Sequence, residues 1–155
     1  MKIGIGYDIH RLSYGNKLII GGIDILFNKG AVAHSDGDVL IHALCDAILG
    51  AIGMPDIGER YPDTDPKYKN ISSVAFLEDM KNILKEKEKA IVNIDSVVML
   101  EMPKLQKYKE KIRKKIAEIL EIEEENVNIK AKTFEGMTEI GVGDAIAAHV
   151  IVLIQ

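Results

Sequence analysis

The chain contains little of what several functional classes need. Its 155 residues include one cysteine, Cys45, and no tryptophan. A lone cysteine cannot close an internal disulfide, and its apolar helical surroundings are typical of a small buried hydrophobe in a reducing compartment. The net charge of −4 argues against a nucleic-acid binder, because binding to a phosphate backbone depends on an excess of Lys and Arg.

Long apolar runs are scarce as well. The longest, residues 145–154, is too short to span a bilayer as a helix and is interrupted by His149. The chain starts on a strand-like segment, without the apolar core of a secretory signal or the pattern of a transit peptide. We therefore expect a cytoplasmic protein with no membrane and no nucleic-acid partner. Its length predicts a single domain over residues 1–155.

The spacing of apolar residues predicts a mixture of strands and helices. Gly21-Gly22, between two short apolar segments, indicates a hairpin. Strands are expected over residues 2–8, 18–20, 23–27, 90–100, 127–131 and 145–154. Helices are expected from a cap at Asp36 or Asp38 to about Leu49, from Ser72 or Ser73 through Leu84, and from Pro103 to Leu120, with a long polar loop over residues 54–71. This order predicts an α+β fold: a two-layer domain with a small mixed β-sheet and helices on one face.

The last predicted strand is apolar on both of its faces. Even-numbered residues 146–154 would face one way and odd-numbered residues 145–153 the other. Helices can cover one face of the sheet, so the second face needs another cover. Sheets packed together in a homo-oligomer would provide it. His149 is therefore expected to be a core or interface residue rather than a ligand.

Candidate chemistry is concentrated in the first 42 residues. They contain His10, His34 and His42, three of the four histidines, and Asp8 shares one face of the first strand with His10. His42 completes a three-ligand set if the start of the first helix abuts that strand. Two imidazoles and one carboxylate suit a catalytic zinc with an open fourth position. The alternative is a solvated Asp8, a surface His10 and a His42 without a function.

Two further segments are candidates for phosphate binding. His34 and Ser35 precede a helix start, where free N–H groups and the helix dipole attract anions, although simple capping by Asp36 or Asp38 explains the same pattern. Residues 130–136 close a strand, where Thr133 can donate to a phosphate oxygen and Glu135 can hold a divalent cation such as Mg²⁺.

Taken together, these segments resemble the 2-C-methyl-D-erythritol 2,4-cyclodiphosphate synthase family over essentially the whole chain. Each motif is weak alone, and their combination in this order is specific. The motifs are Gly4-x-Gly6-Tyr7-Asp8-x-His10, Leu18-Ile19-Ile20-Gly21-Gly22, Ala33-His34-Ser35-Asp36-Gly37-Asp38, His42-Ala43-Leu44-x-Asp46-Ala47, Asp56-Ile57-Gly58, Tyr61-Pro62-Asp63-Thr64-Asp65, Pro103-Lys104 and Lys130-Ala131-x-Thr133-x-Glu135.

The resemblance implies a homotrimer with active sites at the subunit interfaces. It also implies a phosphorus-oxygen lyase of non-mevalonate isoprenoid biosynthesis. Such an enzyme cyclises 4-diphosphocytidyl-2-C-methyl-D-erythritol 2-phosphate to 2-C-methyl-D-erythritol 2,4-cyclodiphosphate and releases CMP. The 2-phosphate of this cytidine diphosphate substrate attacks its β-phosphate. The implied cofactors are one Zn²⁺ per active site and Mg²⁺ or Mn²⁺ with the substrate diphosphate.

The resemblance further assigns roles to individual residues. Asp8, His10 and His42 match the zinc ligands, and Glu135 matches a ligand of magnesium or manganese. His34 and Thr133 are expected to be catalytic, through hydrogen bonds to the transition state. The implied substrate-binding residues are Asp8, His10, His34, Ser35, Asp56, Ile57, Gly58, Tyr61, Pro62, Asp63, Thr64, Asp65, Leu100, Glu101, Met102, Pro103, Lys104, Leu105, Gln106, Ala131, Lys132, Thr133, Phe134 and Glu135.

Three departures from the family pattern concern binding. Lys132 stands where Thr is frequent. Glu139 and Val142 stand where many bacterial members have Phe and Arg, which line the central cavity of the trimer. We therefore expect weak or no binding of isoprenoid diphosphates in that cavity. Leu100 and Met102 differ from the small side chains that are common at the implied cytosine pocket.

Two other functions are compatible with the same ligand set. A zinc-dependent nucleotide phosphodiesterase can use three protein ligands and a metal-bound water. A trimeric binding module with a structural zinc is the non-enzymatic alternative, although structural zinc sites usually have four protein ligands.

Overall fold

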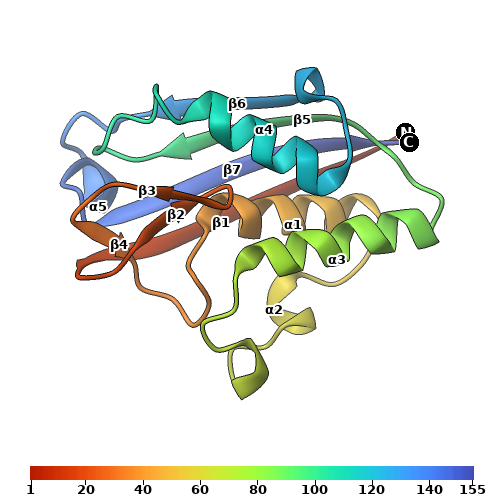
Figure 1. The fold of residues 1–155 in the computed structure, drawn as a ribbon, viewed down its shortest axis with the longest axis horizontal. Coiled ribbons are helices and arrows are strands. Elements are labelled where there is room, and N and C mark those ends of the chain that lie inside the picture. Colours follow the sequence, from red (N-terminus) through yellow and green to blue (C-terminus); the bar gives the residue numbers. More distant parts are fainter.

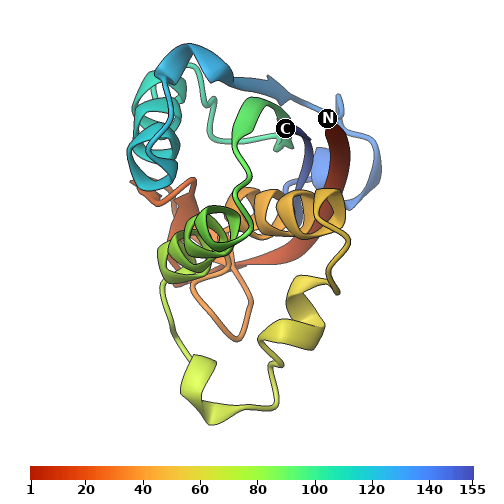
Figure 2. The ribbon, with the colours of Figure 1, turned by 90° about the vertical axis from the view of Figure 1, so that its right-hand side faces the viewer.

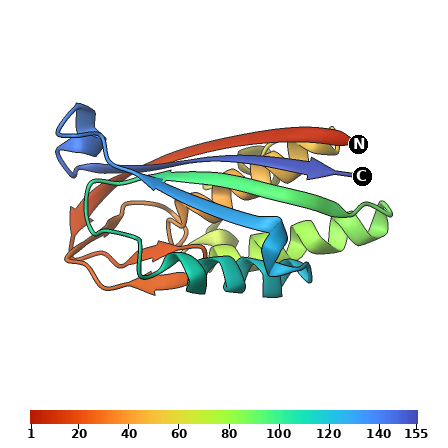
Figure 3. The ribbon, with the colours of Figure 1, turned by 90° about the horizontal axis from the view of Figure 1, so that it is seen from above.

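A computed structural model describes residues 1–155 and shows a mixed five-stranded sheet with the long helices on one side (Figure 1, Figure 3). The strand order is β4-β1-β7-β5-β6, and only the β5–β6 pair is parallel. The strands are β1 (Lys2–Tyr14), β4 (Lys29–Ala31), β5 (Ile91–Met99), β6 (Val127–Lys132) and β7 (Ala145–Ile154). A separate hairpin joins β2 (Leu18–Ile20) to β3 (Ile23–Ile25).

Three long helices form the second layer (Figure 2). They are α1 (Val39–Ala51), α3 (Ser73–Glu86) and α4 (Lys109–Leu120). The short elements are α2 (Ile57–Arg60), α5 (Thr138–Gly141) and two 3₁₀ turns, η1 (Pro66–Tyr68) and η2 (Glu124–Asn126). The core between the layers includes Leu44, Leu77, Ile112 and Val150. The predicted α+β two-layer architecture is confirmed for the chain. No helix combines the length and the apolarity needed to span a bilayer.

The predicted ends of two elements are wrong. β1 continues to Tyr14 instead of ending at residue 8, because it pairs with β7 and then with β4 beyond the start of β7. The third long helix begins at Lys109 rather than at Pro103. Before it, the backbone oxygen of Leu105 accepts a hydrogen bond from the N–H of Tyr108 at 2.9 Å, which forms a turn.

Local structure is also present where the sequence predicts only loops. Residues 54–71 contain α2 and η1, because Asp56 and Asp65 accept backbone hydrogen bonds and cap these short helices. The turn before β7 contains α5, and β4 was not predicted. Asp38 caps α1 and Ser72 caps α3, as two of the alternative predictions have it.

The close packing of α1 on β1 depends on two glycines. A Cβ atom on Gly4 would lie 1.8 Å from the backbone oxygen of Ala47, and one on Gly6 would lie 1.8 Å from that of Ala43. Any side chain at these positions would push the helix away from the strand. Asp8 follows on the same face of β1, so the next helical turn toward the start of α1 lies beside it.

Asp38 connects the start of α1 to the β2–β3 hairpin. Its buried carboxylate accepts hydrogen bonds from the backbone N–H groups of Ile41 at 3.1 Å, Gly21 at 2.9 Å and Gly22 at 2.6 Å. Burial raises the pKa of Asp38 to about 6, against the effect of these donors. One side chain therefore caps the helix and fixes the turn of the hairpin.

The face of the sheet opposite the long helices is partly open. Even-numbered and odd-numbered residues of β7 face opposite ways, as predicted. The even-numbered residues face the core, and α5 covers Ala145 and Ala147 on the other face. Farther along, Ile5 is 64% exposed and Ile151 is 49% exposed. His149 is also exposed, with its ring edge against Tyr7 at 4.6 Å between centroids. The core placement of His149 is therefore wrong within one chain, and its burial in an interface stays a prediction.

Candidate functional site

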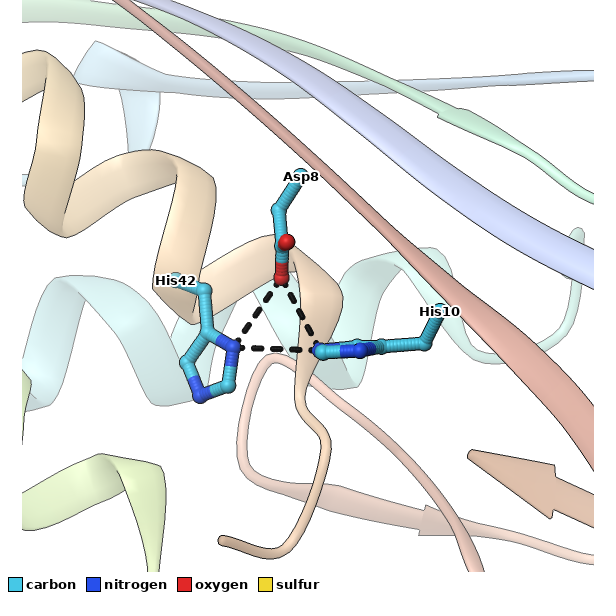
Figure 4. Close-up of side chains that lie close together, drawn as sticks. All are labelled: Asp8, His10 and His42. Carbon is cyan, nitrogen blue, oxygen red and sulfur yellow. Dashed lines mark hydrogen bonds and ion pairs between the residues drawn. The ribbon is translucent and has the colours of Figure 1, made fainter. Parts of the chain in front are cut away.

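Asp8, His10 and His42 bring three metal-binding atoms together (Figure 4). His10 Nε2 and His42 Nδ1 each lie 3.0 Å from Oδ2 of Asp8, and the two ring nitrogens lie 3.2 Å apart. Tetrahedral zinc with bonds of about 2.0–2.1 Å places ligand atoms roughly 3.3 Å apart. The triangle therefore fits a zinc ion with one position left open, and the predicted ligands form a candidate metal site.

The two elements that supply these ligands are held together by their backbones. Asp8 and His10 lie two residues apart on β1 and point to the same side, and His42 lies in the first turn of α1. Gly4 and Gly6 allow α1 to lie directly on the strand, which brings His42 over Asp8. The expected abutment of helix and strand is confirmed.

Contacts of the second ring nitrogen, Nε2, orient the ring of His42. His42 Nε2 lies 2.9 Å from Oγ of Ser73 and 3.2 Å from Oγ of Ser35. Asp36 holds Ser73 by accepting a hydrogen bond from its hydroxyl and another from its backbone N–H, the latter at 2.9 Å. A proton on Nε2 directed at Ser73 leaves Nδ1 free as a metal ligand, which is the usual arrangement of a metal-binding histidine.

Electrostatics in the triad favour replacement of protons by a cation. Burial raises the pKa of Asp8, but hydrogen bonds and attraction from His10 and His42 outweigh burial and hold this pKa well below its usual range. Burial lowers the pKa of His42, and the hydrogen bond and charge of Asp8 raise it by more, so that it lies above its ordinary value of 6.5. A divalent cation satisfies the same carboxylate without protonating the rings.

The triad lies in a pocket of about 490 Å³. Both predicted phosphate-binding residues of the helix start, His34 and Ser35, line it. His34 Nε2 lies 3.4 Å from the backbone oxygen of Asp65, so the pocket wall includes the segment after α2. The remaining lining residues are Ala33, Ile57, Gly58, Tyr61, Asp63, Tyr68 and Phe76.

A second pocket, of about 440 Å³, lies at the carboxyl ends of β5 and β6. Glu101 accepts a hydrogen bond from the backbone N–H of Phe134 at 3.0 Å, and the hydroxyl of Thr133 donates to Glu135. The first contact joins the two segments that form the pocket, as does the backbone hydrogen bond from the N–H of Leu100 to the oxygen of Lys132 at 2.9 Å. Its lining residues are Leu100, Pro103, Lys104, Leu105, Gln106, Lys109, Ala131, Lys132, Thr133 and Glu135.

The two pockets lie on different strands of the same sheet. Asp8 pairs with Ala148, Ala148 pairs with Val98, and Val98 pairs with Ala131. Three strand spacings of about 4.8 Å place the Cα atoms of Asp8 and Ala131 roughly 14 Å apart. One chain therefore does not bring the predicted site residues into a single cavity.

Sequence reasoning missed several residues that shape the first pocket. Ser73 was considered only as a helix cap, and Tyr68 and Phe76 carried no signal beyond loop and core positions. Their roles depend on contacts between distant segments. Conversely, seven residues predicted to bind substrate line neither pocket: Asp56, Pro62, Thr64, Asp65, Glu101, Met102 and Phe134. Of these, Asp56 and Asp65 cap short helices and Glu101 holds the second pocket together.

An α+β domain that holds three metal ligands with an open position in a pocket has the features of a metalloenzyme. The model of the YgbB family matches residues 1–155, and the chain belongs to this family. This membership confirms the resemblance seen in the sequence motifs.

Named relatives are similar over nearly their full length. The 2-C-methyl-D-erythritol 2,4-cyclodiphosphate synthase of Caldicellulosiruptor bescii is 51% identical over 153 residues, which are 99% of this chain and 98% of the relative. The synthase of Alkaliphilus metalliredigens is 50% identical over 152 residues, with 98% and 96% covered.

Solved structures share the fold. A CDP-bound 2C-methyl-D-erythritol-2,4-cyclodiphosphate synthase superimposes with a TM-score of 0.91 at 32% identity, covering 99% of this chain and 100% of the other. A CDP complex of the Plasmodium falciparum protein IspF gives a TM-score of 0.87 at 34% identity, with 99% and 94% covered.

Proposed function

We infer that the chain catalyses the reaction for which its relatives are named, the formation of 2-C-methyl-D-erythritol 2,4-cyclodiphosphate in non-mevalonate isoprenoid biosynthesis. The observation that carries this inference is the triad of Asp8, His10 and His42, in a chain that matches the family over its whole length. The proposed substrate is 4-diphosphocytidyl-2-C-methyl-D-erythritol 2-phosphate.

The proposed chemistry is an intramolecular displacement at phosphorus. An oxygen of the substrate 2-phosphate forms a bond to the β-phosphorus, and the bond from that phosphorus to the bridging oxygen of CMP breaks. CMP leaves with the electron pair. The nucleophile is already anionic near neutral pH, so the enzyme needs no strong base. The barrier consists largely of folding a flexible polyanion, and fixing both of its ends supplies about 7–11 kcal/mol in favourable intramolecular cases.

The residues of the first pocket act by binding and orientation. A zinc ion held by Asp8, His10 and His42 would supply Lewis-acid polarisation of the substrate diphosphate and an anchor for it. His34 and Ser35 line the same pocket and can donate hydrogen bonds to phosphate or to the erythritol hydroxyls. The aromatic rings of Tyr61 and Phe76 line the same pocket and would form an apolar part of its wall.

The second pocket is proposed to bind the cytidine end of the substrate. Support comes from the CDP complexes of two relatives with the same fold. Residues 100–106 would form the wall around the base, and Thr133 would donate to a phosphate oxygen. Glu135 would hold Mg²⁺ or Mn²⁺ together with substrate phosphates, an arrangement in which one protein carboxylate is sufficient.

A homotrimer would bring the first and second pockets of different subunits together into one active site. In the proposed assembly the first pocket of one subunit faces the second pocket of its neighbour. Two observations support this: the roughly 14 Å across the sheet between Asp8 and Ala131, and the exposed apolar face formed by Ile3, Ile5 and Ile151, which needs a cover. Active sites would then lie at the subunit interfaces.

Product analysis tests the proposed function directly. The cytidyl substrate is supplied with Mg²⁺ to zinc-verified protein, and the reaction is followed by ³¹P NMR. Cyclic diphosphate with stoichiometric CMP is the expected result. Linear phosphate products would identify a phosphodiesterase instead, and bound zinc without any turnover would identify a binding module.

A further inference from the structure

One carboxylate binds the last residue of α2, Arg60, and the residue after it, Tyr61, to helix α3. Asp79, on α3, accepts hydrogen bonds at the same Oδ2 atom from Arg60 Nε at 3.0 Å and Arg60 Nη2 at 2.9 Å. The hydroxyl of Tyr61 donates to that oxygen as well. Two consecutive residues, of which Tyr61 lines the metal pocket, are therefore bound to a single side chain from another element.

The Tyr61 ring continues this connection into the metal pocket. Tyr61 stacks on Phe76 with ring centroids 4.4 Å apart and an interplanar angle of 25°, and it meets the edge of Tyr68 at 5.4 Å. The ring of Phe76 lies 6.1 Å from that of His42. Tyr61, Tyr68 and Phe76 all line the pocket. Tyr61 is therefore part of a cluster of aromatic rings that reaches His42 through Phe76.

Charge makes the contact to Asp79 stronger than a neutral surface hydrogen bond. A guanidinium fork and a phenol converge on one carboxylate, and charge-assisted bonds of this kind are roughly twice as strong as neutral ones. Arg60 also lies over the Tyr61 ring, 5.6 Å from its centroid. The Arg60 and Asp79 side chains are about one-third exposed, so solvent weakens the ion pair and the phenol contact adds specificity of position.

We propose that Asp79 is a positioning residue for the reaction: it holds Arg60 and Tyr61 so that residues 57–68 stand ready beside the metal centre before substrate arrives. Asp79 does not line the pocket and acts through Tyr61. An ordered wall lowers the entropy that substrate binding must remove. The proposal rests on the proposed function for its kinetic part only, because the order of the segment can be measured without substrate.

Three single variants, and the double variant of Asp79→Ala with Tyr61→Phe, test the proposal. Asp79→Ala removes the shared acceptor, and Tyr61→Phe removes only the hydroxyl while the stacked ring stays. Glu78→Gln is the matched control, because it removes one negative charge from the adjacent, exposed position of α3, which makes no hydrogen bond or ion pair. The readouts are steady-state kinetics of cyclic product formation and amide hydrogen exchange of residues 57–71.

For Asp79→Ala we expect a KM about three- to tenfold higher with kcat changed by less than about twofold, and a smaller rise for Tyr61→Phe. Hydrogen exchange should become faster in residues 57–71 and stay unchanged in β1 and α1. The double variant should be no worse than Asp79→Ala alone, because both changes break one network. Glu78→Gln should behave as the wild type.

Several results would overturn the proposal. They are an unchanged KM and unchanged exchange in folded Asp79→Ala protein, an equal effect of Glu78→Gln, or a loss confined to kcat. If the wild type forms no cyclic product, the proposed function fails, and the exchange data still decide whether Asp79 orders the segment.

Discussion

The two pockets of this chain differ in how completely one subunit builds them. Around the metal triad, Ser73 and Asp36 hold His42, and the glycines of β1 allow the close approach of α1. In the second pocket, the hydroxyl of Thr133 donates to Glu135 within one segment, and Glu101 is the side chain that accepts a hydrogen bond from the facing segment, from the N–H of Phe134. The comparison teaches that the metal half is pre-organised within the chain, whereas the other half depends on what binds or packs against it.

The largest effect is expected from the loss of a metal ligand in the first pocket. His42→Ala removes one of three ligands, and we expect loss of zinc and a fall in kcat/KM of at least about a hundredfold. Loss of a residue that only supports a ligand typically costs about 10- to 100-fold, so loss of the ligand itself should cost at least as much. Metal content and turnover of the same sample check this. Near-wild-type turnover in protein with verified zinc would remove His42 from the centre. Lys85→Gln on the exposed surface is a suitable control.

Mixing two defective chains tests whether the halves meet across a subunit boundary. Thr133→Ala should reduce turnover by about a hundredfold through loss of one donor to the transition state. Co-assembled His42→Ala and Thr133→Ala chains should recover about a quarter of the wild-type rate, because random mixing in a cyclic trimer leaves one interface in four intact. Recovery should vanish when pre-formed oligomers are mixed without exchange. No recovery in verified mixed oligomers would place both halves in one chain.

Loss of a support should weaken the metal half without removing a ligand. Ser73→Ala leaves His42 Nε2 without its 2.9 Å partner, and we expect zinc affinity to fall about 10- to 100-fold with the fold retained. Competition with a chromophoric chelator measures this. Ser72→Ala is the neighbouring control, since Ser72 caps α3 and does not contact His42. Equal zinc affinity in the Ser73 and Ser72 variants would contradict the orienting role.

Acidification should release zinc from the site of Asp8, His10 and His42. The pKa of His42 lies above 6.5 because of Asp8, and the protonated ring cannot bind zinc, so affinity should fall by about tenfold per pH unit below that pKa. The stability of the metal-free protein should change with pH in the opposite direction and be greater at acidic pH. Stability from the protonated His42–Asp8 pair is complete below pH 6.5 and is lost as the pH rises through the raised pKa. Thermal unfolding of both forms between pH 5 and 8 checks the sign, and parallel curves would refute it.

The smallest effect is expected from a change in the second pocket alone. Glu135→Ala should raise the Mg²⁺ concentration needed for half-maximal activity by roughly three- to tenfold while zinc content stays unchanged. A Mg²⁺ titration at saturating substrate measures this. Glu139→Ala, in α5, is the control. An unchanged Mg²⁺ requirement would remove Glu135 from the cation site.

The sequence predicts one pocket better than the other for a physical reason. Asp8 and His10 follow from strand periodicity, and Asp38 follows from helix capping, because both rules are local. Ser73 and the stacking of Tyr61 on Phe76 depend on contacts between distant segments, for which no local rule exists. Likewise, Pro103 suggests a helix start, but the buried Leu105 is part of a turn before Lys109. The separation of the two pockets follows from strand order, which periodicity does not reveal.

The order of elements along the chain means that the metal ligands are synthesised early, before the sheet can be completed. Residues 2–51 carry all three ligands and the packed β1–α1 pair, whereas β7, the central partner of β1, follows the other four strands of the sheet along the chain and is synthesised after them. Until then, one long edge of β1 has no neighbour. Zinc captured by the nascent N-terminal third would tie its strand to its helix during this interval, so zinc supply in the cell would affect the yield of folded chains as well as their rate.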